Sequence, residues 1–467
     1  MRLVSTRDAS AAQHSYTDVL LSGLAPDGGL YTPEEYPKVT LDELRALKGA
    51  SYETVAFVIK QKLVGDAIPS VELRSLVDST YIEPAFANEK GQVTPVTDVG
   101  RNLKLQNLSL GPTASFKDMA MQLLGREMDY ELARRKDSLT ILGATSGDTG
   151  SAAEAAFKGL GSVELFMLSP EVGMSAFQRA QMGALSGGNI RNISIRGRFD
   201  DCQDLVKAVK QDSEFAALGA VNSINWGRIS SQVPYYFSGY LQAVKEVGEE
   251  VDFVVPSGNF GNVFSGYVAK RMGLPIRRLV VATNENNVLS RLMQTGVYAQ
   301  KEAVITSSPS MDISKASNYE RLAFDLFGRD ATKLSAYMHE FNTTGLVSFL
   351  DHGLSVEAFL ALGFESGSST HEERIRTIQD IYKDTGIVID PHTADGVCVA
   401  KKRDIQEVPV ICLATALPVK FEETIREALG FVPERPARFV GLEEEMKQGS
   451  FITMDADVEA LKSQLRA

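Results

Sequence analysis

Short apolar runs alternate with longer amphipathic stretches along most of this chain after about residue 95. The runs are rich in Val, Ile and Leu, are bounded by glycine or serine, and include 139–142, 163–168, 251–255, 279–282 and 408–413. A continuous apolar run predicts a strand buried on both faces, and such strands separated by helices are typical of parallel sheets. We therefore expect an α/β core.

The first 90 or so residues have a different pattern. Helical periodicity runs through 16–21, 41–47 and 52–63, and the segment 23–31 is dense in turn formers. This pattern predicts a separate, mainly helical unit. A second helical region is expected over 323–380, where helix formers and charges are common and only 366–370 is a polar interruption. We interpret that region as a helical insertion on a sheet domain.

Composition narrows the class of protein. The chain has 467 residues, 44% of them apolar, which is enough for about two or three globular domains. Its net charge of −12 opposes long-range attraction to nucleic acid or to anionic membranes. The N-terminus has no apolar signal segment and no run approaches about 18 apolar residues. We expect a cytoplasmic enzyme that binds neither nucleic acid nor membrane.

The spacing of the cysteines and histidines in the sequence does not match that of a known metal-binding motif. Cys202, Cys398 and Cys412 are far apart in the sequence, which predicts reduced thiols in the core. The five histidines form no ligand pattern such as HExxH, so no metal site is expected. His392, in the segment Asp-Pro-His-Thr, is interpreted as a surface or hydrogen-bonded core residue.

Three short segments suggest chemistry. Lys117 lies in GPTASFKD (111–118), at an expected helix start, and two loops follow strands and enter helices: SGDTG (146–150) and SGNFGN (257–262). A lysine amine can form a Schiff base with an aldehyde cofactor, and glycine-rich loops at helix starts can bind anions. Together they favour pyridoxal phosphate catalysis.

Each of these segments also has a plainer explanation when it is taken alone. Lys117 fits an exposed lysine, 257–262 fits a tight strand-to-helix turn, and 146–150 fits a loop in which Asp148 or Thr149 caps the helix. Thr415, at the end of the run 408–413, can hydrogen-bond a pyridine nitrogen or simply the backbone. Asp148 would repel a substrate carboxylate unless its side chain turns away.

The ordered set of motifs resembles the threonine synthase family, in its longer form with an N-terminal extension. The segments that agree span nearly the whole chain: 23–31, 111–118, 144–150, 177–182, 199–203, 222–229, 257–262, 282–284, 390–394 and 414–416. The resemblance implies two parallel-sheet α/β domains of the fold-type-II, tryptophan-synthase-β-like class plus an N-terminal mainly helical domain. It implies a helical extension over 1–95, a smaller α/β domain over 96–240 and a larger one over 241–467, with which some early segments pack.

The same resemblance implies a lyase reaction that depends on pyridoxal 5'-phosphate. The enzyme would convert O-phospho-L-homoserine and water to L-threonine and phosphate, by γ-elimination and β-addition of water, as the last step of threonine biosynthesis. Lys117 would hold the cofactor as a Schiff base and, with Thr149, act in catalysis. The cofactor would be bound by Lys117, Gly258, Asn259, Phe260, Gly261, Asn262 and Thr415, and the substrate by Ser146, Gly147, Asp148, Thr149, Ser223 and Arg228.

Some alternatives stay open at the level of sequence. A threonine dehydratase or an O-phosphohomoserine phospho-lyase would share most of these motifs, and a non-catalytic homologue that binds phosphorylated ligands would share some of them. Leu417 stands where many relatives have histidine, so we assign it no catalytic role, and Lys420 is a weak substitute. The protein is expected to be a monomer or a homodimer.

Overall fold

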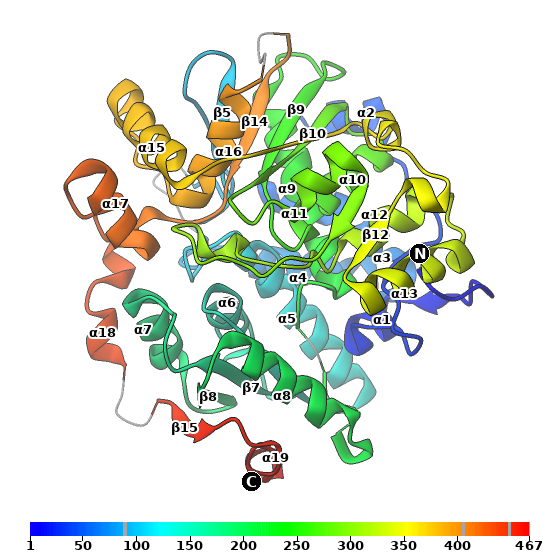
Figure 1. The fold of residues 1–467 in the computed structure, drawn as a ribbon, viewed down its shortest axis with the longest axis vertical. Helices are drawn as coiled ribbons and strands as arrows, with labels where there is room; N and C mark the ends of the chain where they lie inside the picture. Colours follow the sequence, from blue (N-terminus) through cyan, green and yellow to red (C-terminus); the bar gives the residue numbers. More distant parts are fainter. Residues whose placement is uncertain (87–90, 216, 220, 404–406, 447–449, 467) are drawn as a thin grey trace.

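Two sheets of mainly parallel strands organise the chain (Figure 1). The computed structural model describes residues 1–86, 91–215, 217–219, 221–403, 407–446 and 450–466. The six-stranded sheet has the order β13 (Phe364–Ser368), β10 (Ile276–Thr283), β9 (Val251–Pro256), β14 (Val410–Ala414), β5 (Leu103–Asn107) and β4 (Val96–Asp98). The four-stranded sheet has the order β15 (Ile452–Asp455), β8 (Ile190–Arg196), β7 (Val163–Pro170) and β6 (Leu139–Ala144). Among these pairings only β4 with β5 is antiparallel.

All five apolar runs predicted as strands are strands, and the α/β core is confirmed. In β9 every residue is buried, because helices cover both faces of the sheet. Phe253 and Val255 belong to one apolar cluster, while Val254 between them belongs to another. Successive side chains of β9 therefore pack alternately against the helices on one face of the sheet and against those on the other.

Helices pack on both faces of each sheet. The large sheet lies between α9 (Trp226–Ala243) and α10 (Gly261–Met272) on one face and α15 (His371–Thr385) and α16 (Pro391–Lys401) on the other. The small sheet packs against α8 (Phe199–Gln211) and α19 (Val458–Arg466) on one side. Its other side meets α5 (Lys117–Arg135), α6 (Asp148–Phe157) and α7 (Ala176–Leu185). Further helices are α11 (Val288–Thr295), α17 (Glu422–Leu429) and α18 (Leu442–Glu445).

The N-terminal unit contains the three expected helices and a small sheet that was not expected. The helices are α1 (Tyr16–Ser22), α2 (Leu41–Leu47), α3 (Tyr52–Val64) and a fourth, α4 (Ser70–Thr80). The sheet is antiparallel and has the order β2 (His14–Ser15), β1 (Arg2–Ser5) and β3 (Tyr31–Pro33). Strands this short have too little alternation to be recognised in a sequence.

The interpretation of 323–380 as a purely helical insertion is wrong in one respect. The region contains α12 (Tyr319–Leu326), α13 (Ala331–Thr344), α14 (Glu357–Ala361) and α15, but its polar interruption falls largely in β13, an edge strand of the large sheet. Because an edge strand is partly solvated, its sequence FESGS lacks the apolar run of a central strand. A short antiparallel pair, β11 (Val297–Ala299) and β12 (Leu346–Ser348), also lies here.

Sheet membership crosses the expected domain ranges. β4 and β5 fall within 96–240 but belong to the large sheet, and β15 falls within 241–467 but joins the small sheet. Neither sheet is thus built from one continuous segment. The domain boundaries at 95 and 240 stay a prediction. All three cysteines are buried and free, as expected.

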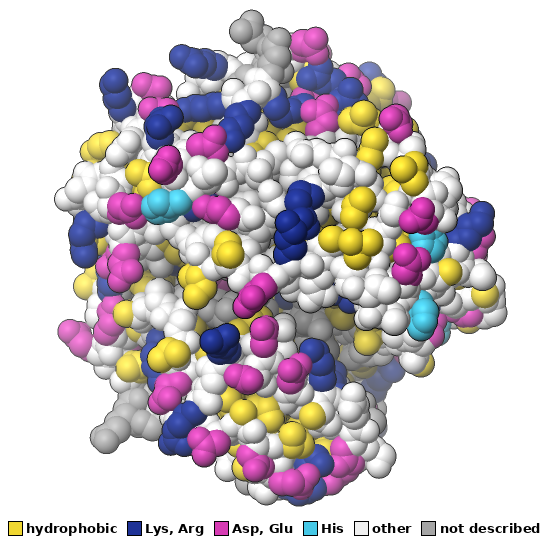
Figure 2. All heavy atoms as spheres, viewed as in Figure 1, with side chains coloured by type: hydrophobic (Ala, Val, Ile, Leu, Met, Phe, Trp, Pro, Cys, Tyr) yellow, Lys and Arg dark blue, Asp and Glu magenta, His cyan; other side chains and the backbone are white. Residues whose placement is uncertain are grey.

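The surface agrees with a mixed, overall acidic charge. On the face shown in Figure 2, basic and acidic side chains are interspersed over both parts of the molecule. Within the described ranges, no helix is both long and apolar enough to cross a bilayer.

Candidate active site

The loops that follow β6, β9 and β14 meet at one cavity between the two sheets, together with the start of α5. Of the predicted site residues, the structure places Lys117, Asp148, Thr149, Ser223, Arg228, Gly258, Asn259, Phe260, Gly261, Asn262 and Thr415 in its lining. Ser146 and Gly147 belong to the same loop as Asp148 but do not line the cavity, and Ser146 is exposed. Predicted residues from five distant segments of sequence thus converge on a single site.

The loop 257–262 forms a close-fitting cradle. Phe260 is the N-cap of α10 and has a φ of 65°, which turns the chain sharply into the helix. A Cβ built on Gly258 would lie 3.1 Å from Met311 Cα and 3.2 Å from Ser310 O. Glycine is therefore favoured there by the close approach of a neighbouring backbone. No side chain caps the first turn of α10, so its amides are available to an anion.

Two polar groups of this cradle are buried without a partner among the described residues, namely Ser257 Oγ and Asn262 Nδ2. Asn262 Oδ1 accepts hydrogen bonds from Tyr235 at 2.6 Å and Tyr236 at 2.8 Å. The two tyrosines fix the amide so that its donor end is left free. A buried donor without a partner costs free energy unless a ligand satisfies it.

Lys117 is the first residue of α5, and its side chain is 12% exposed. Its Nζ lies 3.3 Å from Asp148 Oδ2 and 5.4 Å from the centre of the Phe116 ring. Burial lowers the pKa of Lys117, the Asp148 carboxylate opposes that shift, and Lys420 and Arg228 add to it. The plain reading of Lys117 as an exposed lysine is wrong, because it lines the cavity with its pKa lowered towards that of a nucleophile.

The loop 145–150 is shaped by Thr145. Its Oγ1 accepts hydrogen bonds from Gly147 N at 2.9 Å and Gly150 N at 2.8 Å, and Gly147 has a φ of 136°. The N-cap of α6 is Gly147, which makes no side-chain cap bond. The alternative in which Asp148 or Thr149 caps this helix is therefore wrong.

The Asp148 side chain is turned away from the helix start. Its carboxylate accepts from Lys420 Nζ at 2.8 Å, Ser310 Oγ at 2.7 Å and Gln178 Nε2 at 2.9 Å, in addition to Lys117. Burial alone would raise the pKa of Asp148, but Lys420 and Lys117 hold it well below its usual range. The carboxylate is thus ionised and fully partnered.

Arg228 has no acidic partner in the part of the chain that the structure describes. It lies in the first turn of α9, is 3% exposed, and its Nη1 donates to Val221 O at 3.0 Å. Its Nε is buried without a partner, and burial lowers the pKa of Arg228 to about 10. A buried guanidinium without a counter-ion, in the wall of a cavity, makes an anion site with the geometry to bind phosphate. Ser223 lines the same cavity.

Thr415 couples the large sheet to the lysine. It follows β14, is 5% exposed, and its carbonyl accepts a hydrogen bond from Phe116 N at 2.8 Å. Its own N donates to Thr393 Oγ1 at 3.3 Å. The backbone of Thr415 is therefore fixed directly beside the residue that precedes Lys117.

Ser310 and His392 line the cavity but were not predicted as site residues. Ser310 N donates to His392 Nε2 at 3.0 Å, and His392 Nδ1 lies 3.0 Å from Asp390 Oδ1. His392 is thus the hydrogen-bonded core residue that was expected, yet it holds Ser310 against Asp148. Only the helix-start pattern Asp-Pro-His was visible in the sequence, since Ser310 comes from a loop without a motif.

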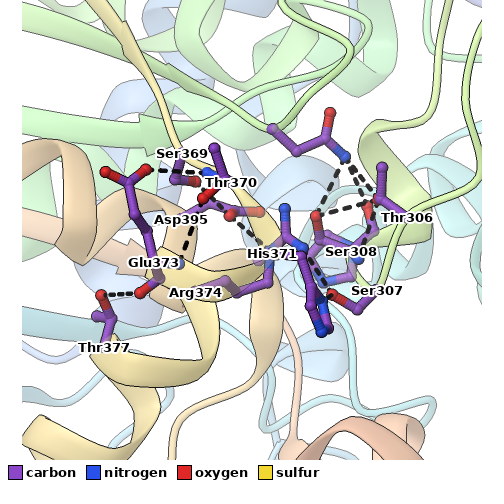
Figure 3. A network of polar contacts seen from close by, with 12 residues as sticks. Thr306, Ser307, Ser308, Ser369, Thr370, His371, Glu373, Arg374, Thr377 and Asp395 are labelled. Carbon is purple, nitrogen blue, oxygen red and sulfur yellow. Dashed lines mark hydrogen bonds and ion pairs between the residues drawn. The ribbon is translucent and has the colours of Figure 1, made fainter.

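A buried ionic network fixes the loop that leads to Ser310 (Figure 3). Arg374 of α15 donates from Nε to Asp395 Oδ1 at 2.7 Å and from Nη1 to Ser307 Oγ at 2.6 Å. Burial raises the pKa of Asp395 to about 6 even though Arg374 and Ser369 favour its charged form. The network holds Ser307 on α15 and α16, and Ser310, three residues further on, lines the cavity.

Leu417 and Lys420 lie next to the site and do not line its cavity. The Lys420 side chain is completely buried and also donates to Thr113 O at 2.9 Å. Its contacts are to Asp148 and the backbone, so its role as a substitute for a histidine at position 417 stays a prediction.

The residues present fit pyridoxal phosphate. The cavity combines a buried lysine amine, a glycine cradle with unpartnered buried donors, and a hydroxyl at the end of β14, which match an aldehyde, a phosphate and a ring nitrogen in turn. Arg228 is a further buried cation in the cavity wall, separate from the cradle 257–262.

Comparison with known proteins agrees with this geometry. A family model described as "Pyridoxal-phosphate dependent enzyme" matches residues 92–338. The chain is therefore an enzyme that depends on pyridoxal phosphate. Models of the threonine synthase N terminus and C-terminal region match residues 2–81 and 393–465. The chain belongs to the threonine synthase family.

Individual relatives cover the whole chain. A threonine synthase of Methylobacillus glycogenes is 49% identical, with 99% of this chain and 98% of that protein aligned, and one of Corynebacterium glutamicum is 47% identical over 98% and 97%. The crystal structure of a PLP-bound threonine synthase from Brucella melitensis is similar with a TM-score of 0.93 and 41% identity, covering 100% of this chain and 99% of that one. The fold-type-II assignment is confirmed.

Proposed function

We propose that this enzyme converts O-phospho-L-homoserine and water to L-threonine and phosphate. The observation on which the proposal rests is that Lys117 shares its cavity with two separate anion sites, the cradle 258–262 and Arg228. A cofactor phosphate needs one of them, and a phosphorylated amino-acid substrate needs the other. The threonine synthase names of full-length relatives support the same reaction.

Lys117 would hold the cofactor through its amine, with Gly258, Asn259, Gly261 and Asn262 around the cofactor phosphate. Phe260 closes the turn that presents these amides, and Thr415 offers a hydroxyl to the ring nitrogen. When bound, the cofactor supplies an electron sink for negative charge that develops at the substrate's Cα and Cβ. The lowered pKa of Lys117 suits it to accept those protons and return them.

Arg228 and Ser223 would hold the γ-phosphate of the substrate. The guanidinium can donate two parallel hydrogen bonds to it and stabilise the charge that grows as the phosphate departs. Because Arg228 pairs with no carboxylate of the described residues, its full charge would be available to the leaving group.

Ser146, Gly147, Asp148 and Thr149 would bind the amino-acid end of the substrate through the start of α6. The Asp148 carboxylate points towards Lys420 and Lys117, so its charge is balanced where a second carboxylate must bind. Thr149 lines the cavity and is proposed to direct water to Cβ.

Product analysis tests the reaction. The purified enzyme is incubated with O-phospho-L-homoserine, and threonine and inorganic phosphate are measured in parallel. Equal amounts of the two are expected. The appearance of 2-oxobutyrate and ammonia without threonine would instead identify a phospho-lyase.

The role of Lys117 is tested by replacing it. Lys117→Ala is expected to abolish both covalent retention of the cofactor and turnover, while the exposed Lys207→Ala retains both. Continued turnover in the Lys117 variant would remove the basis of the assignment. We also infer that the enzyme is cytoplasmic and binds no nucleic acid. We further infer that it is a monomer or a homodimer, and sedimentation analysis can test this oligomeric state.

A further inference from the structure

Two buried lysines share one carboxylate at the edge of the cavity. Asp148 Oδ1 lies 2.8 Å from Lys420 Nζ, and Asp148 Oδ2 lies 3.3 Å from Lys117 Nζ. The Lys420 side chain is 0% exposed and that of Asp148 is 5% exposed. A lysine is rarely buried this completely without a partner whose charge it must balance.

The two lysines differ in how their charge can change. Lys117 would change its bonding when it holds the cofactor, because its nitrogen would then be shared with that group. Lys420 does not line the cavity, and it is tied to Thr113 O as well as to Asp148. Its contact with Asp148 therefore does not depend on the bond that Lys117 would form with the cofactor.

An unpartnered Asp148 would interfere with the reaction in two ways. If Lys117 were its only cationic partner, bonding of Lys117 to the cofactor would leave the buried carboxylate with hydrogen bonds from Ser310 and Gln178 and with no charge partner except a proton held on the nitrogen that Lys117 shares with the cofactor. The same carboxylate could swing to the free amides of α6 and compete with the substrate there. Either outcome costs binding free energy.

We propose that Lys420 is a positioning residue that holds Asp148 ionised and turned away from the start of α6, which frees Lys117 to leave its ion pair and bond the cofactor. The inference rests on the role proposed for Lys117. It assigns Lys420 no contact with substrate or cofactor, because its effect is transmitted through Asp148.

The charges around Lys117 set the direction of the expected change. Asp148 on α6 raises the pKa of Lys117, while Lys420 from the short helical turn Pro418–Phe421 and Arg228 from α9 lower it. His392 on α16 also lines the cavity. Removing Lys420 should therefore strengthen the hold of Asp148 on a proton at Lys117 Nζ, and removing the charge of Asp148 should weaken it.

The test is a pH titration of the visible absorption band of the bound cofactor in the holoenzyme. In Lys420→Met the transition is expected to move upward by about one pH unit, the usual effect of one nearby charge. In Asp148→Asn it is expected to move downward, and in the double variant it should return close to the wild-type position. Lys420→Arg, which keeps the charge, should titrate like the wild type.

Lys60→Met is the matched control, because Lys60 is another lysine with 0% exposure that pairs with a buried carboxylate, Glu127, outside the cavity. It should lower stability without moving the titration. If Lys420→Met does not fold, the opposite shift in Asp148→Asn and the folding of the double variant still test the proposal.

An unchanged titration in Lys420→Met, or no reversal in the double variant, would overturn the role of Lys420. That failure is distinct from failure of the proposed function. The function fails if Lys117→Ala keeps the band and the turnover, whatever Lys420 does.

Discussion

Arg228 is the residue in the site whose electrostatic state is furthest from that of an ordinary surface residue. It is buried, its pKa is lowered to about 10, and its Nε has no partner among the described residues. Burying such a charge without a counter-ion destabilises the folded protein. Binding of a dianionic phosphate would recover part of the lost stability, so we expect this side chain to favour phosphorylated over unphosphorylated substrates.

Replacement of Arg228 should therefore affect the substrate more than the cofactor. We expect Arg228→Ala to lower kcat/KM for O-phospho-L-homoserine about 10- to 100-fold, the loss for a charge-assisted contact, and Arg228→Lys to recover only part of it. Steady-state kinetics and cofactor absorbance together measure the two effects. The half-exposed Arg191→Ala is the control. Equal loss of cofactor from Arg228→Ala would place this residue at the cofactor phosphate instead.

At the scale of residues, the sequence indicated which polar groups belong to the site but not their hydrogen-bond partners or their pKa shifts. The motifs around Lys117, Asp148 and Arg228 were visible, because they are short and contiguous. Two of the partners that hold the Asp148 carboxylate, Ser310 and Lys420, come from segments far away in sequence and have no motif of their own. Only the fold brings them within hydrogen-bonding distance of Asp148.

At the scale of elements, the cradle after β9 depends on contact between two backbones. The loop 257–262 packs directly against 310–311, so the two segments fix each other's position. The sequence predicted the strand, the turn and the helix, because each has a local signal. It did not predict the second segment, and it missed β13, since a polar edge strand has no local signal.

Gly258→Ala tests this contact. The added Cβ would meet Met311 Cα at 3.1 Å, so backbone atoms must move and the cradle should lose its shape. We expect weaker cofactor binding by about 1–3 kcal/mol, the cost typical of an overpacked site. Equilibrium titration of the apoenzyme with pyridoxal phosphate measures the change.

Gly161→Ala is the matched control, since a Cβ there would meet nothing within 4 Å. It should bind the cofactor normally. If Gly258→Ala also binds normally, the loop and the segment 310–311 are not held together as tightly as the structure indicates.

At the scale of the whole molecule, a buried ion pair and its hydrogen bonds join the N-terminal unit to one helix of each sheet, α5 of the small sheet and α9 of the large sheet. Lys60 of α3 lies 3.0 Å from Glu127 of α5, and it donates to Ser230 and Ser231 of α9 at 3.0 and 3.1 Å. The N-terminal unit is thus fixed to the helix that starts with Lys117 and to the helix that presents Arg228. The N-terminal unit supports these two helices from outside the cavity, and none of its described residues lines the cavity.

We expect Lys60→Met to lower the free energy of unfolding by about 3–5 kcal/mol, because it removes the cationic partner of the buried Glu127 side chain. The double variant Lys60→Met, Glu127→Leu should recover most of that loss. Denaturation in urea can be followed by fluorescence of Trp226, the single tryptophan, which is fully buried on α9. No loss in the single variant would mean that the pair is not decisive for docking of the N-terminal unit.

The strand β15 has a consequence for how the protein is made. It pairs with β8 to complete the small sheet, although the ribosome adds residues 452–455 long after β8 has been synthesised. Until then the nascent chain exposes the unpaired edge of β8, which can pair with another chain. Protection of this edge during translation, by a chaperone or by the ribosome surface, would therefore matter more to the yield of folded enzyme than the stability of the finished protein.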